Sequence, residues 1–291
     1  MTAEPAPSAR SRCPICDGTG WKAVETGDVR RVARCDCWSR SVATRLGTEA
    51  RIPRRYQHCT LRNFVTYGNE SLERALARTA RLIDEFPAGE RGLFLLGPPG
   101  VGKTHLAVAA LHEIIRAKAV RGLFFDTRDL LRVIRSTYDP VVRTTELEVI
   151  RPVVETDLLV LDDLGAEKPS EWVEETLNLI VNTRYNERRL TLFTSNYEDN
   201  PDPTDPSSLT GRIGLRMRSR LHEMCDALDL DGADYRQLPT NGGADDLIAL
   251  WKTRRRQQGR RALPSRASSP ARARRDEGHA ELRWPGGRAG S

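Results

Sequence analysis

One stretch of eight residues constrains the fold of this chain more than any other feature. Residues 97–104 read Gly-Pro-Pro-Gly-Val-Gly-Lys-Thr, which matches the phosphate-binding loop pattern G-x-x-x-x-G-K-[ST]. The apolar run 93–96 precedes the loop and a helix-like stretch follows it, as a phosphate-binding strand, loop and helix require. Glycines let successive backbone N–H groups turn towards one anion, and the helix N-terminus adds partial positive charge. The chain is therefore expected to bind ATP or GTP.

The loop predicts individual contacts to the nucleotide. Lys103 is expected to reach the β and γ phosphates, and Thr104 to hold Mg²⁺. The residues expected around the phosphates are those of the loop and the one that follows it: Gly97, Pro98, Pro99, Gly100, Val101, Gly102, Lys103, Thr104 and His105.

Two further strand ends predict the chemistry of this site. Residues 158–161 are all apolar, and the carboxylates of Asp162 and Asp163 follow them. Asp162 is expected to join the magnesium shell, and Asp163 to orient or polarise the attacking water. The strand-like run 192–195 ends in Asn196, whose amide could position the same water. Together these residues predict hydrolysis of the nucleotide.

The order of apolar segments predicts an α/β fold with a doubly wound parallel sheet. Strand-like and helix-like stretches alternate from about residue 61 to residue 230. The expected strands are 93–96, 122–125, 158–161, 190–194 and 227–230. The expected helices are 103–117, 128–137, 171–187, 212–223 and 243–256.

Composition divides the chain further. We expect a disordered N-terminus over residues 1–12 and a small module over 13–39. Residues 40–60 are expected to form a short helix and then a basic linker. An ATPase domain over 61–240 follows, and then a short helix with a disordered basic tail over 241–291. Residues 251–291 hold 12 Lys and Arg against 3 Asp and Glu, so the excess of positive charge lies mostly at the chain ends. No apolar run is long enough to span a membrane and no leader pattern is present, so a cytoplasmic location is expected.

Four of the six cysteines form a paired pattern, Cys13-x-x-Cys16 followed by Cys35-x-Cys37. In a reducing compartment this spacing favours Zn²⁺, which takes four thiolates tetrahedrally, over disulfides. Residues 13–39 are too few to form a hydrophobic core, so a zinc ion would staple them; free thiols are the alternative. The two remaining cysteines, at positions 59 and 225, are expected to be small buried apolar residues.

Arginines are concentrated in two helix-like stretches. Residues 212–221 contain four of them, and one could be supplied to the γ-phosphate of a neighbouring subunit, while the others form a solvated face. On residues 128–138, Leu130, Leu131 and Ile134 share one helical face while arginines 128, 132 and 135 form a second stripe. This stripe could contact single-stranded DNA or simply be solvated.

The full set of motifs, in this order, resembles the DnaC/DnaI-type replicative helicase loaders and the IstB-type transposition helper ATPases, both of the AAA+ class. The resemblance covers roughly residues 50–237. It is carried by residues 52–56, 97–104, 161–165, 183–188, 194–196, 219–221 and 234–236. It implies that Asn196 is sensor 1, Arg220 the arginine finger and Arg236 the sensor 2 residue. Only about 20 residues separate the last expected strand from residue 250, which leaves no room for a full helical lid.

The resemblance implies an AAA+ ATPase that uses ATP, Mg²⁺ and a zinc module. The expected function is to load a hexameric replicative helicase onto single-stranded DNA through ATP-dependent self-assembly. The alternative is an IstB-type helper that binds double-stranded DNA and regulates a transposase. A small-molecule kinase and a module that holds ATP without turnover are weaker alternatives. Because Asp163 replaces the usual glutamate with a shorter arm, hydrolysis is expected to be slow and switch-like.

Overall fold

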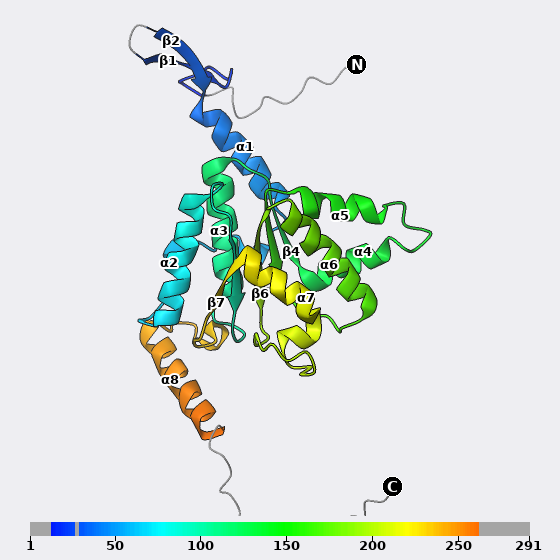
Figure 1. The fold of residues 1–291 in the computed structure, drawn as a ribbon. Coiled ribbons are helices and arrows are strands. Elements are labelled where there is room, and N and C mark those ends of the chain that lie inside the picture. The colour runs from blue at the N-terminus through cyan, green and yellow to red at the C-terminus, as the bar shows by residue number, and fades with distance from the viewer. Residues whose placement is uncertain (1–12, 27–28, 262–291) are drawn as a thin grey trace, which may run out of the picture. The chain divides into compact units, whose positions relative to one another are not determined.

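A parallel five-stranded sheet forms the centre of the protein in the computed structural model, which describes residues 13–26 and 29–261. The strand order is β4-β5-β6-β3-β7 (Figure 1). The strands are β3 (Gly92–Leu96), β4 (Gly122–Asp126), β5 (Leu158–Asp162), β6 (Leu190–Ser195) and β7 (Cys225–Asp229). This order places β6 between β3, which leads into the phosphate-binding loop, and β5, which ends in the acidic pair.

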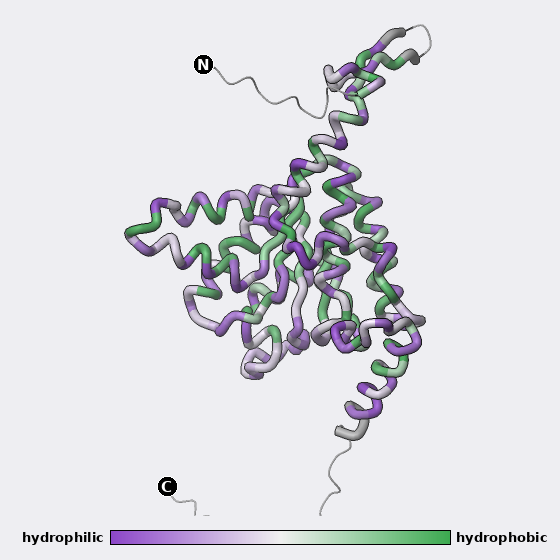
Figure 2. Tube along the Cα trace, turned by 180° about the vertical axis from the view of Figure 1, so that it is seen from behind, coloured by the Kyte–Doolittle hydropathy of each residue, from purple (hydrophilic) through white to green (hydrophobic). Residues whose placement is uncertain are grey.

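Helices cover both faces of the sheet, as the predicted doubly wound α/β class requires. Helices α1 (Asp36–Glu49), α2 (Glu70–Glu85) and α3 (Lys103–Lys118) pack against one face. Helices α4 (Thr127–Ser136), α5 (Glu146–Glu155), α6 (Glu171–Asn186) and α7 (Leu209–Met224) pack against the other. Side chains alternate along β3, since Leu93 and Leu95 join the first core and Phe94 and Leu96 the second. Figure 2 shows hydrophobic residues concentrated in these central strands.

The observed elements differ from the expected ones in a few places. Helix α7 starts at Leu209 and bends at Gly214, where φ is 78°. Strand β7 starts at Cys225, two residues earlier than expected, because Cys225 pairs with Gly92 at the start of β3. Helices α2 and α5 are additional, and the sequence pattern of α5 is obscured by Pro152 inside it. The short helix expected at the start of the stretch 40–60 is most of α1, but the linker expected after it contains core residues.

The N-terminal module consists of a hairpin and the start of α1. Strands β1 (Trp21–Thr26) and β2 (Val29–Arg34) pair antiparallel, with Trp21 opposite Arg34. The guanidinium of Arg34 lies 3.7 Å from the ring centre of Trp21 and 4.4 Å from that of Trp38. Helix α1 begins directly after Cys35 and ends against α3 and β4. The two tryptophans therefore stack on one arginine beside the cysteines.

After β7 the described chain contains a 3-10 turn (Tyr235–Gln237) and helix α8 (Ala244–Arg261), so no full helical lid follows the sheet there. Residues up to 252 belong to one compact unit, and residues 253–261, the end of α8, belong to a second. Among the described residues, no helix has the length and apolar character needed to cross a bilayer. The expected disordered segments, 1–12 and the tail from 262 onward, lie outside the described residues.

Candidate functional site

The phosphate-binding loop connects β3 to α3 and closely approaches two other segments. A Cβ added to Gly97, where φ is 135°, would lie 2.0 Å from the carbonyl oxygen of Leu230. A Cβ added to Gly100, where φ is 80°, would lie 1.7 Å from a carboxylate oxygen of Asp234. These positions therefore need glycine both for their backbone angles and for space. The N–H of Tyr235 also donates to the Gly100 carbonyl at 3.0 Å, which ties the segment after β7 to the loop.

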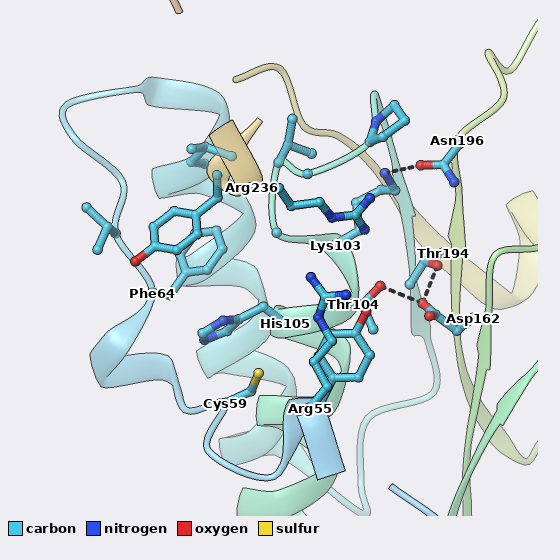
Figure 3. Close-up of a pocket in the computed structure, with 18 of the residues that line it drawn as sticks. Arg55, Cys59, Phe64, Lys103, Thr104, His105, Asp162, Thr194, Asn196 and Arg236 are labelled. Atoms are coloured by element: carbon cyan, nitrogen blue, oxygen red, sulfur yellow. Dashed lines mark hydrogen bonds between the residues drawn. The ribbon is translucent and has the colours of Figure 1, made fainter. Parts of the chain in front are cut away.

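Lys103 is buried at the start of α3, and its ammonium group points back into the loop. Its Nζ donates to the carbonyl oxygens of Gly97 and Pro98, both at 2.8 Å, and to Oδ1 of Asn196 at 2.7 Å (Figure 3). Asn196 directly follows β6, the strand beside β3. The sheet order thus brings the predicted phosphate-binding lysine and the predicted sensor amide together.

Asp162 lies at the end of β5 and accepts two hydroxyl hydrogen bonds. Thr104 Oγ1 donates to its Oδ1 at 2.9 Å and Thr194 Oγ1 at 2.6 Å (Figure 3). Burial raises the pKa of Asp162, and the two hydroxyl bonds partly oppose that effect. Thr104 and Asp162, the two residues expected to hold Mg²⁺, are thus neighbours. Their oxygen atoms are of the type that Mg²⁺ binds, so the site fits this ion.

Asp163 adopts a left-handed backbone, with φ of 58°. Its Oδ2 accepts from Nη2 of Arg128 at 2.9 Å, and its Oδ1 accepts from the amide Nδ2 of Asn196. The hydroxyl of Thr194 also accepts from the N–H of Asp163 at 2.9 Å. Sequence reasoning missed the contacts of Thr194 and Arg128, because both partners lie more than thirty residues away along the chain.

These residues line a single cavity of about 730 Å³. Its lining includes residues 99–104 of the loop together with Asp162, Asp163 and Asn196. The predicted sensor 2 residue Arg236 also lines the cavity, as does Arg55, which the sequence pattern did not single out (Figure 3). The lining also includes apolar residues, namely Cys59, Phe64, Val65, Tyr67, Leu72, Val101, Ala233 and Leu247. The cavity can therefore hold a ligand that has both charged and apolar parts.

His105 lines the cavity from the first turn of α3. Its Nε2 is 2.9 Å from the carbonyl oxygen of Thr60, and its ring meets that of Phe64 edge-on at 5.5 Å. Burial lowers the pKa of His105, which favours the neutral ring at pH 7. The neutral ring of His105 can therefore contact a ligand in the cavity without adding charge.

Arg220, the predicted arginine finger, does not line this cavity. It lies on α7 beside a second cavity of about 500 Å³ between α6 and α7. The lining there is Glu171, Glu174, Glu175, Asn178, Leu179, Asn182, Arg216 and Arg220. Within one chain, the structure therefore does not bring Arg220 to Lys103.

Arg184, from the motif at 183–188, is buried inside the protein. It is 1% exposed, and its guanidinium donates to the carbonyls of Val153, Thr156 and Leu190 at 2.6–3.0 Å and to Thr191 Oγ1 at 2.8 Å. Burial lowers the pKa of Arg184 to about 9, which leaves it charged at pH 7. This arginine links the end of α5 to β6 through its hydrogen bonds, and it does not line the cavity.

The four N-terminal cysteines form one cluster, and all their sulfur atoms lie within 4.8 Å of one another. The Sγ atoms of Cys13 and Cys35 are 3.7 Å apart, and those of Cys16 and Cys37 are 3.3 Å apart. A tetrahedral zinc site with Zn–S bonds of about 2.3 Å has sulfur atoms about 3.8 Å apart. Backbone N–H groups of Ile15 and Cys16 also hold the pKa of Cys13 below its ordinary value. The cluster therefore fits Zn²⁺, despite the short Cys35-x-Cys37 half.

Helix α4 has the two faces expected from its sequence. Leu130, Leu131 and Ile134 are buried, while arginines 128, 132 and 135 lie on the outer side. The guanidinium of Arg135 lies 4.5 Å from the ring centre of Trp172 on α6. Trp172 in turn donates its Nε1 hydrogen to the hydroxyl of Tyr138, at 3.2 Å. The outer face of α4 thus continues into a pair of aromatic rings.

Comparisons with known proteins identify relatives of this chain. The sequence model of a family described as IstB-like ATP binding protein matches residues 45–237. The replicative helicase loader DnaC of Escherichia coli (strain K12) is 29% identical over 169 residues, which make up 57% of this chain and 64% of DnaC. The chain therefore spans slightly less than two thirds of that relative's length.

Solved structures show the same fold. A crystal structure of the DnaC helicase loader has a TM-score of 0.53 and 36% identity, covering 61% of this chain and 99% of that one. A crystal structure of DnaI has a TM-score of 0.52 and 24% identity, covering 64% and 94%, and it shows similarity of fold alone. The segment that matches the family includes the phosphate-binding loop, the acidic pair and Asn196.

Proposed function

The chain belongs to the IstB-like ATP-binding protein family, and from this premise we propose that it is an AAA+ ATPase that loads a replicative helicase onto single-stranded DNA. The observation that carries the proposal is the joint placement of Lys103, Asp162, Asp163 and Asn196 at the ends of β3, β5 and β6. Similarity to the DnaC loader supports helicase loading as the use to which ATP binding is put.

In hydrolysis, the polar residues that line the cavity would each have a separate role. Lys103 would leave the carbonyls of Gly97 and Pro98 to bind the β and γ phosphates. Thr104 and Asp162 would hold Mg²⁺, which neutralises charge on the phosphate oxygens when bound. Asp163 would accept a proton from the attacking water, and Asn196, already hydrogen-bonded to Asp163, would orient that water.

Two arginines would complete the site. Arg236 lines the cavity, and as sensor 2 it would contact the γ-phosphate of its own chain's nucleotide. Arg220 lies outside that cavity, so as an arginine finger it would act on the nucleotide of a neighbouring subunit. ATP-dependent self-assembly would then be required for hydrolysis.

We assign the helicase contact to the cysteine module of residues 13–39. Its four thiolates would bind Zn²⁺, and the Trp21–Arg34–Trp38 stack lies beside them. Trp21 is half exposed and therefore available to a partner. Helix α1 would couple this module to the ATPase domain, proposed to cover residues 61–240.

The outer face of α4 would bind single-stranded DNA. Its arginines could pair with phosphates, and the Tyr138–Trp172 pair could stack on bases, which single strands expose. Val141, in the segment between α4 and α5, is 86% exposed and adds apolar surface to this part of the protein. Such stacking favours single strands over a duplex.

The family match also supports the second candidate, an IstB-type helper that binds double-stranded DNA and regulates a transposase. Both candidates share the ATP site, so the type of DNA separates them. The test is the ATPase rate with a single-stranded oligonucleotide and with a duplex of the same sequence. Stimulation by the single strand supports the loader, and stimulation by the duplex alone supports the transposition helper. A Tyr138→Ala variant should lose the single-strand stimulation and keep the basal rate.

A further inference from the structure

Helix α7 is interrupted at Gly214, and the part after this break carries the proposed arginine finger. Gly214 has φ of 78° and ψ of 157°, far from helical values, so residues 215–224 are not a rigid continuation of residues 209–213. Contacts to other segments must therefore fix the position of Arg220. We propose that Asp199 is a positioning residue that holds this part of α7, so that Arg220 is presented to a neighbouring subunit. The proposal rests on the proposed role of Arg220 as an arginine finger.

Asp199 contacts the second part of α7 at two points, one helical turn apart. Its Oδ1 accepts from Nε of Arg218 at 2.5 Å, and its Oδ2 lies 2.7 Å from Nε2 of His222. The side chain of Asp199 is only 15% exposed, so salt screens these contacts less than it would on an open surface. Arg220 lies between the two contacted residues in the sequence. One carboxylate thus holds both ends of the turn that carries Arg220.

Two faces of α7 separate the held residues from the proposed finger. In a helix, residues four apart share a face, and residues two apart lie about 200° from one another around the axis. Arg218 and His222 therefore share the face towards Asp199. Arg216 and Arg220 share a different face, which lines the second cavity against α6. Asp199 can thus fix the helix without contacting the finger itself.

Apolar packing alone defines the rotation of this part of α7 less strictly than these contacts do. Met217 and Leu221 are buried in the core beneath it. Apolar contacts are non-directional, whereas charge-assisted hydrogen bonds impose a geometry. Loss of the Asp199 carboxylate would therefore let Arg220 shift while the core stays packed.

The loop that carries Asp199 begins at Asn196, which belongs to the chain's own ATP site. Asn196 has separate contacts there, to Nζ of Lys103 and to the carboxylate of Asp163. Removal of the Asp199 carboxylate should therefore disturb the finger and leave the ATP site of the same chain intact. A residue that merely supported the fold would affect both.

The test measures hydrolysis in a mixture of two complementary variants. Lys103→Ala retains the finger but cannot bind ATP, and Arg220→Ala binds ATP but supplies no finger, so the mixture should hydrolyse ATP in the Arg220→Ala chains. Asp199→Ala added to the Lys103→Ala chain should lower phosphate release by the mixture about tenfold, because a displaced group loses much of its effect on the transition state. Asp199→Ala added to the Arg220→Ala chain should leave the rate nearly unchanged.

Two further variants make this comparison specific. Asp202→Ala is the matched control, because Asp202 lies in the same loop and its carboxylate accepts from Thr204. Arg218→Ala in the Lys103→Ala chain should reproduce the loss, and adding Asp199→Ala to it should cause little further loss, as expected for two partners of one contact. The side chain of Arg218 is 24% exposed, so this variant keeps the test valid if Asp199→Ala does not fold.

An unchanged rate with Asp199→Ala and with Arg218→Ala in the Lys103→Ala chain would overturn the proposal. An equal loss from either chain, with normal ATP affinity of the Arg220→Ala chain by calorimetry, would overturn it as well. If the mixture of Lys103→Ala and Arg220→Ala is itself inactive although the two co-assemble, the finger role of Arg220 fails instead. The failure of this proposal and that of the proposed function are therefore distinguishable.

Discussion

Arg128, at the start of α4, forms an ion pair with Asp163, with 2.9 Å between Nη2 and Oδ2. The other carboxylate oxygen of Asp163 accepts from the amide of Asn196. Both oxygens of the proposed catalytic carboxylate are therefore engaged by protein groups. Arg128 also belongs to the arginine stripe proposed to bind DNA, and it is about half exposed. One arginine thus connects the proposed DNA surface to the proposed water-activating group.

The first prediction concerns this ion pair. Arg128→Ala should raise the ATPase rate measured without DNA several-fold, because Oδ2 of Asp163 becomes free to accept a proton from water. Steady-state phosphate release at saturating ATP measures this rate. Arg132→Ala is the matched control, since Arg132 lies on the same helix and pairs with Asp129. A lower rate in Arg128→Ala with normal ATP affinity would show that Arg128 assists catalysis instead of restraining it.

The second prediction separates binding from hydrolysis. Lys103→Ala should abolish ATP binding, because the loop loses the cation that reaches the phosphates. Asp163→Asn should bind ATP normally but hydrolyse it about 100-fold more slowly or worse, since an amide cannot accept the proton. Calorimetry and single-turnover hydrolysis measure the two effects. Equal ATP binding by Lys103→Ala and the wild type would count against the whole site assignment.

The third prediction concerns Arg220 and tests self-assembly. Arg220→Ala should bind ATP normally and hydrolyse it about 100-fold more slowly or worse, because a finger acts only in the transition state. Mixing it with Lys103→Ala should restore part of the rate, since each inactive chain supplies what the other lacks. Arg216→Ala, from the same helix face, is the control. A mixture that stays inactive, although the two variants co-assemble, would remove Arg220 from the proposed active site.

The fourth prediction concerns the cysteine cluster. Protein purified without chelator should contain about one zinc per chain, and Cys35→Ser should lower that content because serine is a poor zinc ligand. Elemental analysis measures the content. Cys225→Ala, which changes a buried cysteine outside the cluster, should leave it unchanged. Chelation should unfold the module without changing ATP affinity, and a zinc content near zero in the native protein would refute the site.

The fifth prediction concerns Arg184. Arg184→Ala should lower the free energy of unfolding by on the order of 3 kcal/mol, because several buried carbonyls lose their donor at once. Urea denaturation measures this change. Arg74→Ala, at an exposed position on α2, should change it by less than about 0.5 kcal/mol. Normal stability together with lost ATP binding would indicate that Arg184 acts in the site instead.

The parts of the fold that depend on local sequence could be predicted. The phosphate-binding loop and the five strands have strong local patterns, and the structure confirms the parallel α/β sheet. The sheet order then explains why Lys103, Asp162 and Asn196 meet, although they are far apart in the chain. The exact strand and helix ends, and helix α5 with its internal proline, depend on tertiary packing that local patterns do not contain.

Contacts between distant side chains could not be predicted. Nothing near Thr194 in the sequence indicates that its hydroxyl contacts both acidic residues. From the sequence alone, Arg128 could equally be a solvent-exposed residue on the face of a helix. Its contact with Asp163 can be expected only once β4 and β5 are known to be neighbours. Arg184 looks like a surface charge in a polar motif, and only the packing of α5, α6 and β6 reveals its burial. A short helix was expected over residues 243–256. The sequence did not indicate that this helix, α8, would contribute to the lining of the nucleotide cavity.

The most direct test of the account is native mass spectrometry of the full chain mixed with the replicative helicase of its host, with and without ATP. A chain lacking residues 1–39 serves as the control for the cysteine module. The account predicts a discrete complex with the helicase hexamer that is absent for the shortened chain. If no complex forms in any nucleotide state, the helicase-loading function is contradicted and the transposition helper becomes the better explanation.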